Sequence, residues 1–155
     1  MTTPVTALDP RYSDPSAAPV GWEETRRLLE AAELSWISTV RADGRPHVTP
    51  LVAAWVEGAV YFHTGAEEQK FANLRANPHV VLTTGCNRWD EGIDVVVEGA
   101  AVHVTDEKLL TRVALACGLA PGAAVLIVAW AGQGVAGALP PRCRTSPSPW
   151  AAPSG

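Results

Sequence analysis

The chain is 155 residues long, which suits one domain with a hydrophobic core. Sixteen acidic residues outnumber twelve basic ones and give a formal net charge of −4, so no nucleic-acid partner is expected. The three cysteines are far apart and odd in number, which argues against a disulfide framework and a cysteine-based metal site and fits a reducing cytoplasm.

An arm and a helix are expected at the start of the chain. Residues 1–20 contain four prolines and little apolar pattern, which predicts an extended arm. They also lack the basic-then-apolar pattern of a secretory signal, so a cytoplasmic protein is expected. Residues 22–32 place Trp22, Leu28, Leu29 and Ala32 on roughly one face, which predicts a short amphipathic helix.

Three strands are expected next. Residues 34–41 alternate apolar and small polar side chains, which is typical of a half-buried strand. Its inward side chains are expected to be Leu34, Trp36 (or its neighbours) and Val40. An Asp-Gly turn then leads into a long strand at 46–56, and a Glu-Gly turn leads into a third strand at 59–64.

The rest of the pattern is a helix at 65–77, strands at 79–84 and 93–104, and a helix reaching about residue 117. Antiparallel strands with short connections favour a small barrel over a parallel sheet, which needs a crossover between each pair of strands. The expected fold class is therefore mainly β with flanking helices. The domain is expected to span residues 21–117.

The junction between the third strand and the following helix is the most informative stretch for function. A helix N-terminus offers backbone N–H groups and the positive end of a dipole. Thr64, Gln69 and Lys70 add a hydroxyl, an amide and a cation, a set that suits a phosphate. The alternative is an ordinary capped helix with a solvated lysine, and Glu67 and Glu68 argue locally against a phosphate.

Two further stretches are candidates for ligand contact. Pro50 lies inside the second strand and deletes a ladder donor, which indicates an edge, a bulge or backbone groups that face a flat cofactor ring. His47 and His63 lie on successive predicted strands, from which their side chains could approach each other, although a structural or surface role is the more common one for a strand histidine. The loop at 86–92 is either a ligand-covering loop or an ordinary hairpin loop.

The order of elements and the sequence itself are similar to a known family. The run WISTVRADGRPHVTPLVAAWVEGAVYFHTGAEEQKFANLRANPHVVLTTG, followed by W-x-x-G-x-DVVVEGAAVHVTD, resembles the pyridoxamine 5′-phosphate oxidase-like superfamily, in its branch of F420- or FMN-dependent oxidoreductases. The resemblance covers about residues 22–115. It implies an FMN-binding split β-barrel that forms a homodimer, with two cofactor sites at the subunit interface.

The resemblance also implies a set of cofactor-binding residues: His47, Val48, Thr49, Pro50, His63, Thr64, Gln69, Lys70, Trp89 and Asp94. The strand residues would follow the cofactor ring through backbone contacts, and Gln69 with Lys70 would hold the phosphate. Trp89 and Asp94 would come from the neighbouring loop and strand, of the same or the other subunit. In flavin-binding relatives an arginine commonly precedes the lysine. Gln69 removes that bidentate partner, which weakens the case for tight FMN binding and is compatible with F420.

The function that the resemblance implies is an oxidoreductase that uses F420 or FMN to transfer a hydride to a small conjugated substrate. The cofactor carries most of that chemistry, so no catalytic residue is nominated and no metal site is expected. Two alternatives remain open. One is a non-catalytic module that binds a cofactor or a tetrapyrrole, and the other is an inactive relative with an altered C-terminus.

The C-terminal segment, residues 118–155, departs from the family. It is rich in alanine, glycine and proline, and no charged residue occurs from 113 to 141. We expect an atypical low-complexity tail and a barrel that lacks the family's last strands, as an alternative reading frame of a GC-rich gene would produce. A disordered tail and a membrane helix at 114–139 are the rival interpretations, and no membrane association is expected.

Overall fold

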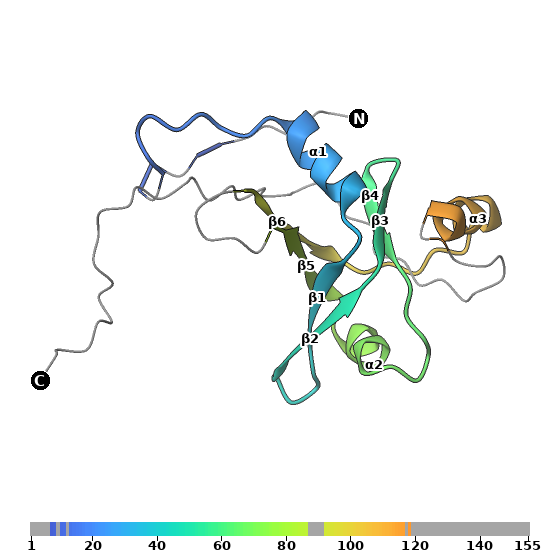
Figure 1. Ribbon diagram of the computed structural model, residues 1–155. Helices are drawn as coiled ribbons and strands as arrows, with labels where there is room; N and C mark the ends of the chain where they lie inside the picture. The colour runs from blue at the N-terminus through green and yellow to red at the C-terminus, as the bar shows by residue number, and fades with distance from the viewer. Residues whose placement is uncertain (1–6, 9, 12, 87–91, 117, 119–155) are drawn as a thin grey trace, which may run out of the picture.

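The computed structural model describes residues 7–8, 10–11, 13–86, 92–116 and 118 (Figure 1). The elements are α1 (Trp22–Ala31), β1 (Ser35–Val40), β2 (Pro46–Leu51), β3 (Ala53–Val56), β4 (Ala59–Phe62), α2 (Gln69–Ala76), β5 (His79–Gly85), β6 (Asp94–Ala100) and α3 (Glu107–Ala116). The predicted order of helices and strands is confirmed. One predicted strand, at 46–56, is divided in two.

The strands within the described residues form two antiparallel sheets. One sheet has four strands in the order β2-β1-β5-β6, and the other consists of β3 and β4. The chain leaves the first sheet at Val52 and enters the second, which is why the predicted long strand is divided. Of the three interpretations of Pro50, the edge strand agrees with the structure, because β2 lies at the end of the four-stranded order, where a missing N–H donor costs little.

The inward face of β1 is the opposite of the predicted one. Ser35, Ile37 and Thr39 are buried on the side that faces the core. The residues predicted to point inward are exposed: Leu34 (49%), Trp36 (47%) and Val40 (37%). Cross-strand partners decide the face, because Ile37 lies opposite Leu82 of β5 and packs with it in the core.

β4 joins two hydrophobic clusters. All four of its residues are buried, as in a strand that is covered on both faces. Val60 and Phe62 pack in the cluster beneath the four-stranded sheet. Ala59 and Tyr61 pack on the other side with Val113, which is fully buried in α3.

The three helices cover different parts of the sheets. Figure 1 shows α1 and α2 at opposite ends of the strands, and α3 beside β3 and β4. The ring of Trp22 in α1 packs edge-on against Trp55 of β3, with ring centroids 5.5 Å apart. The helix α2 packs on β1, and this contact positions the site described below.

Several sequence predictions lie outside the described residues. They include residues 87–91 of the loop that contains Trp89 and all of the C-terminal segment except residue 118. The question of missing last strands therefore stays a prediction. Within the described part of the chain, no helix has both the length and the apolar character needed to cross a membrane.

Candidate functional site

The candidate site is the β4–α2 corner, which comprises residues 64–70. Thr64 follows β4 and is almost fully buried, at 1% exposure. Residues 65–68 form a turn, in which the Glu68 N–H donates to the Gly65 carbonyl at 3.1 Å. α2 therefore begins at Gln69, four residues later than predicted from the sequence. The Gly65 N–H in turn donates to Oε1 of Glu68 at 2.6 Å, which closes the corner on itself.

Lys70 is the buried cation of this corner. Its side chain is only 7% exposed, so it is not the solvated lysine of the alternative interpretation. Its Nζ forms an ion pair with Oε2 of Glu68, a side chain that is 44% exposed. Burial lowers the pKa of Lys70, because removing the ammonium from water disfavours its charged form. A buried cation at the first turn of a helix favours a negatively charged partner.

A chain of hydrogen bonds connects the start of α2 to β1 and β2. Asn73, which is 2% exposed, donates from Nδ2 to Oγ1 of Thr39 at 2.8 Å. Gln69 donates from Nε2 to Oδ1 of Asn73 at 2.8 Å. Arg41, just after β1, donates from Nη1 to Oε1 of Gln69 at 3.3 Å. The Thr39 hydroxyl also lies 3.4 Å from Nδ1 of His47, so the network reaches the second strand.

His47 lies within the electrostatic influence of two cations. Partial burial lowers its pKa, and the positive charges of Arg41 and then Lys70 lower it further. The imidazole is therefore neutral at neutral pH. Lys70 is already paired with the carboxylate of Glu68, so an anionic ligand at the β4–α2 corner would have to take the place of that carboxylate.

The structure brings together four of the residues predicted for the cofactor site. Lys70 and Thr64 belong to the β4–α2 corner, and the hydrogen-bond chain connects Gln69 to His47. Half-buried His63 lies between β4 and Thr64.

Other predicted residues lie elsewhere. Thr49 shares the inward face of β2 with His47, whereas Val48 and Pro50 lie on the exposed outer face, because side chains alternate along a strand. Asp94 begins β6 opposite Gly85, at the end of the sheet where β1 starts and away from Gln69. Trp89 lies outside the described residues.

Four residues of the site were not predicted as ligand contacts. The carboxylate of Glu68 contacts both the Gly65 N–H and Nζ of Lys70. From the sequence alone, Glu68 was considered only as a residue that argues against a phosphate. Thr39 and Asn73 join the helix to the sheet, and Arg41 contacts Gln69. The signal for Asn73 was its position three residues after Lys70, on the same side of the helix.

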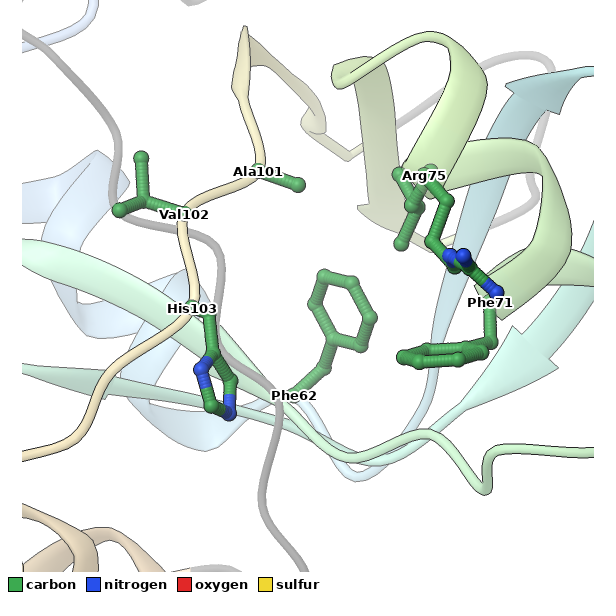
Figure 2. Close-up of a pocket in the computed structure, with 7 residues that line it drawn as sticks. Phe62, Phe71, Arg75, Ala101, Val102 and His103 are labelled. Atoms are coloured by element: carbon green, nitrogen blue, oxygen red, sulfur yellow. The ribbon is translucent and has the colours of Figure 1, made fainter.

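A small pocket lies on another side of α2 (Figure 2). It has a volume of about 160 Å³ and is lined by Phe62, Phe71, Leu74, Arg75, Ala101, Val102 and His103. Ligand pockets usually have about 300–1,000 Å³, so this one is too small for a three-ring cofactor. None of the predicted site residues lines it. Among the described residues, no group of three or more histidine, cysteine or carboxylate side chains is arranged to hold a metal ion.

Comparisons with known proteins agree with the observed architecture. No curated protein matches the chain in sequence. Among solved structures, a conserved hypothetical protein from Mycobacterium tuberculosis is 28% identical with a TM-score of 0.57, over 61% of this chain and 60% of that one. This chain thus spans less than two thirds of that relative's length.

Two further structures align over most of their own length. A FAD binding protein from Mycobacterium smegmatis is 23% identical with a TM-score of 0.59, over 83% of this chain and 93% of that one. An F420 reductase is 24% identical with a TM-score of 0.53, over 68% and 93%. The family model described as pyridoxamine 5′-phosphate oxidase matches residues 22–125, which is more than half of the chain. This chain therefore belongs to the pyridoxamine 5′-phosphate oxidase family, and its fold is the split β-barrel of that family.

Proposed function

We propose that this chain binds a phosphate-bearing flavin or deazaflavin, FMN or F420, and acts as an oxidoreductase on a small conjugated substrate. The observation that carries the proposal is the buried Lys70 in the β4–α2 corner. Burying an ammonium ion is costly unless an anion accompanies it. Proteins place such cations where they bind a charged ligand or where an ion pair holds the fold.

The residues present fit a phosphate. Lys70 supplies a charge and Gly65 a backbone N–H, and the buried Thr64 hydroxyl donates to the Gly65 carbonyl of the same corner. Arg41 lies against Gln69, so a guanidinium is close to the position where flavin-binding relatives carry an arginine. The names of two structural neighbours, a FAD binding protein and an F420 reductase, support a cofactor of this class.

The cofactor would supply the hydride chemistry, and the residues of this chain would bind and orient it. His47 and Thr49 would face it from β2, and Gln69 with Lys70 would hold its phosphate. Because His47 is neutral, it can accept or donate a hydrogen bond without adding charge. Asp94 and Trp89 are proposed to approach from a neighbouring segment or subunit.

Cofactor binding can be tested with a matched pair of lysine variants. Purified protein is titrated with FMN and, separately, with F420, and cofactor fluorescence is followed. We expect micromolar binding of one cofactor, and a loss of about 10-fold or more in Lys70→Ala, because the phosphate loses its cation and meets the carboxylate of Glu68 without a compensating charge. The control is Lys108→Ala, which removes an exposed lysine of α3. Equal affinities for both variants, or no binding of either cofactor by wild type, would count against the proposal.

The proposed active form is a homodimer that joins through the outer face of the four-stranded sheet. Trp36, Val40 and Val48 expose 47%, 37% and 54% of their surface on this face. Adjacent large apolar side chains on a sheet face favour burial against another surface. Pairing of two copies there would bring Val48 and Pro50 to the interface, where the family resemblance puts the cofactor.

The dimer proposal is tested by sedimentation equilibrium. Trp36→Lys is expected to shift the protein from dimer to monomer, because it introduces a charge into this apolar face. Leu115→Lys changes an equally apolar and more exposed residue of α3, at 69% exposure, and should leave the dimer unchanged. Circular dichroism is used to check that both variants are folded. A monomeric wild type would refute this arrangement.

A turnover assay separates an oxidoreductase from a non-catalytic cofactor carrier, because both need the same site. The protein is loaded with the reduced form of whichever cofactor it binds and mixed with small conjugated acceptors. Consumption of the reduced cofactor faster than in its protein-free solution supports the enzyme. Tight binding without accelerated oxidation by any acceptor would favour the carrier.

A further inference from the structure

The carboxylate of Glu68 lies where the donors of the β4–α2 corner converge. Its Oε1 accepts the Gly65 N–H at 2.6 Å, and its Oε2 pairs with Nζ of Lys70. Two oxygens of a phosphate would use the same two donors, because carboxylates and phosphates both accept through paired oxygens. We propose that Glu68 is an internal competitor for the cofactor phosphate and thereby sets how strongly this chain prefers phosphate-bearing ligands.

The fit of the carboxylate depends on the glycine beneath it. A Cβ on Gly65 would lie 3.3 Å from Oε1 of Glu68, closer than most contacts of this kind. The carboxylate therefore sits directly against the backbone of the corner. A phosphate and this carboxylate are unable to occupy the same space, so binding of one requires displacement of the other.

Displacement is feasible because the two partners of the ion pair differ in exposure. The Glu68 side chain is 44% exposed and reaches water by a change of rotamer. The Lys70 side chain, at 7% exposure, stays in place as the fixed part of the corner. A phosphate that binds here therefore replaces the Glu68 carboxylate at Lys70. Its net binding energy is smaller than it would be at an unpaired lysine.

This inference rests on the proposed function, since it concerns the same phosphate position. It predicts that the protein discriminates only weakly between ligands with and without the phosphate group. In wild type, FMN should bind only slightly more tightly than riboflavin, which lacks the phosphate. Removing the charge of Glu68 should raise the affinity for FMN and leave that for riboflavin unchanged. The expected gain is about 10-fold or more, the size of a charge-assisted hydrogen bond.

The test uses Glu68→Gln and, as a matched control, Glu67→Gln. Both variants lose one negative charge from the same turn, and only Glu68 contacts the donors of the corner. Thermal unfolding is measured against increasing inorganic phosphate, with sodium chloride at equal ionic strength as the reference. Phosphate should stabilise Glu68→Gln at about 10-fold lower concentration than wild type or Glu67→Gln. Adding Lys70→Ala to Glu68→Gln should abolish that gain.

The outcomes separate this inference from the proposed function. An equal response to phosphate in wild type and both glutamine variants would overturn the competitor role of Glu68, even where FMN binds. A selective phosphate response of Glu68→Gln, in a protein that binds neither FMN nor F420, would support the competitor role and overturn the cofactor proposal. Glu68→Ala is the second variant if Glu68→Gln does not fold.

Discussion

Replacing Asn73 with alanine tests whether the buried polar contact between α2 and β1 holds the site together. Asn73 is 2% exposed and makes two side-chain hydrogen bonds of 2.8 Å, one to Thr39 and one from Gln69. Each such bond contributes about 0.5–1.5 kcal/mol net, and the truncation also leaves a small cavity. We therefore expect Asn73→Ala to lower the free energy of unfolding by about 2–4 kcal/mol.

A double-mutant cycle isolates the bond between the helix and the strand. Thr39→Val removes the hydroxyl from a side chain that is 3% exposed and leaves Nδ2 of Asn73 without its acceptor, at a cost of about 1–3 kcal/mol. The double variant should be less destabilised than the sum of the two single variants, by about 1–2 kcal/mol, because the same bond is counted in both.

Urea unfolding followed by circular dichroism measures these energies. All proteins are compared at one concentration, since association would make stability depend on concentration. Arg75→Ala, at an exposed position of the same helix, is the control and should change stability by less than about 0.5 kcal/mol. Additive single variants, or a loss below about 0.5 kcal/mol in Asn73→Ala, would refute the idea that this contact anchors α2.

Three further predictions concern other parts of the fold. Gly85→Ala should lower the free energy of unfolding by about 1–3 kcal/mol in urea, because its Cβ would lie 2.8 Å from Cα of Asp94; wild-type stability would show that this strand pair is less tight. Val113→Ala, at 0% exposure, should cost about 1.5–3 kcal/mol in the same assay, and an unchanged midpoint would contradict its burial in the core. The pKa of His47, measured by NMR, should lie below 6.5 and rise in Arg41→Ala. Since the unfolded chain protonates His47 first, its contribution to stability is present above pH 6.5 and is lost as pH falls from 6.5 through the lower pKa of the folded protein, a dependence that His47→Gln should remove.

Local signals in the sequence were sufficient for the order of elements. Gly44 and Gly58 both have positive φ angles, of 85° and 86°, as the turns predicted at these positions require. Glu23 and Glu24 in the first turn of α1 and Glu107 in the first turn of α3 suit the positive end of a helix dipole. This signal and the change from alternating to helical spacing also depend only on near neighbours along the chain. The order of helices and strands was therefore predictable.

Features that depend on contacts between distant parts of the chain were not predictable from these local signals. β1 carries apolar side chains on both faces, so its own pattern fits either orientation. The face that is buried depends on Leu82, which is 45 positions from its cross-strand partner Ile37. The division of the second strand at Val52 likewise depends on which sheet each half joins. Pairings of this kind follow from the packed fold and not from local propensity.

The candidate site was predictable only where its residues are neighbours in the sequence. Thr64, Gln69 and Lys70 are close together in the sequence, and their side-chain chemistry indicated a phosphate position. Arg41 contacts Gln69 across 28 residues of sequence, and Thr39 contacts Asn73 across 34 residues. No spacing rule connects a strand end to a helix at that separation, so these partners required the structure.

The helix α2 buries its polar side more completely than its apolar side. Lys70 and Asn73 are 6% and 2% exposed, whereas Phe71 and Leu74 are only half-buried. Apolar residues at the two buried positions would give equal or greater stability, because a buried charge must recover its loss of hydration. The helix could have buried its apolar side instead, so its orientation is not the one that stability alone favours. Departures of this kind concentrate at functional sites. The orientation of α2 therefore supports an anion-binding role for the β4–α2 corner independently of the family comparison.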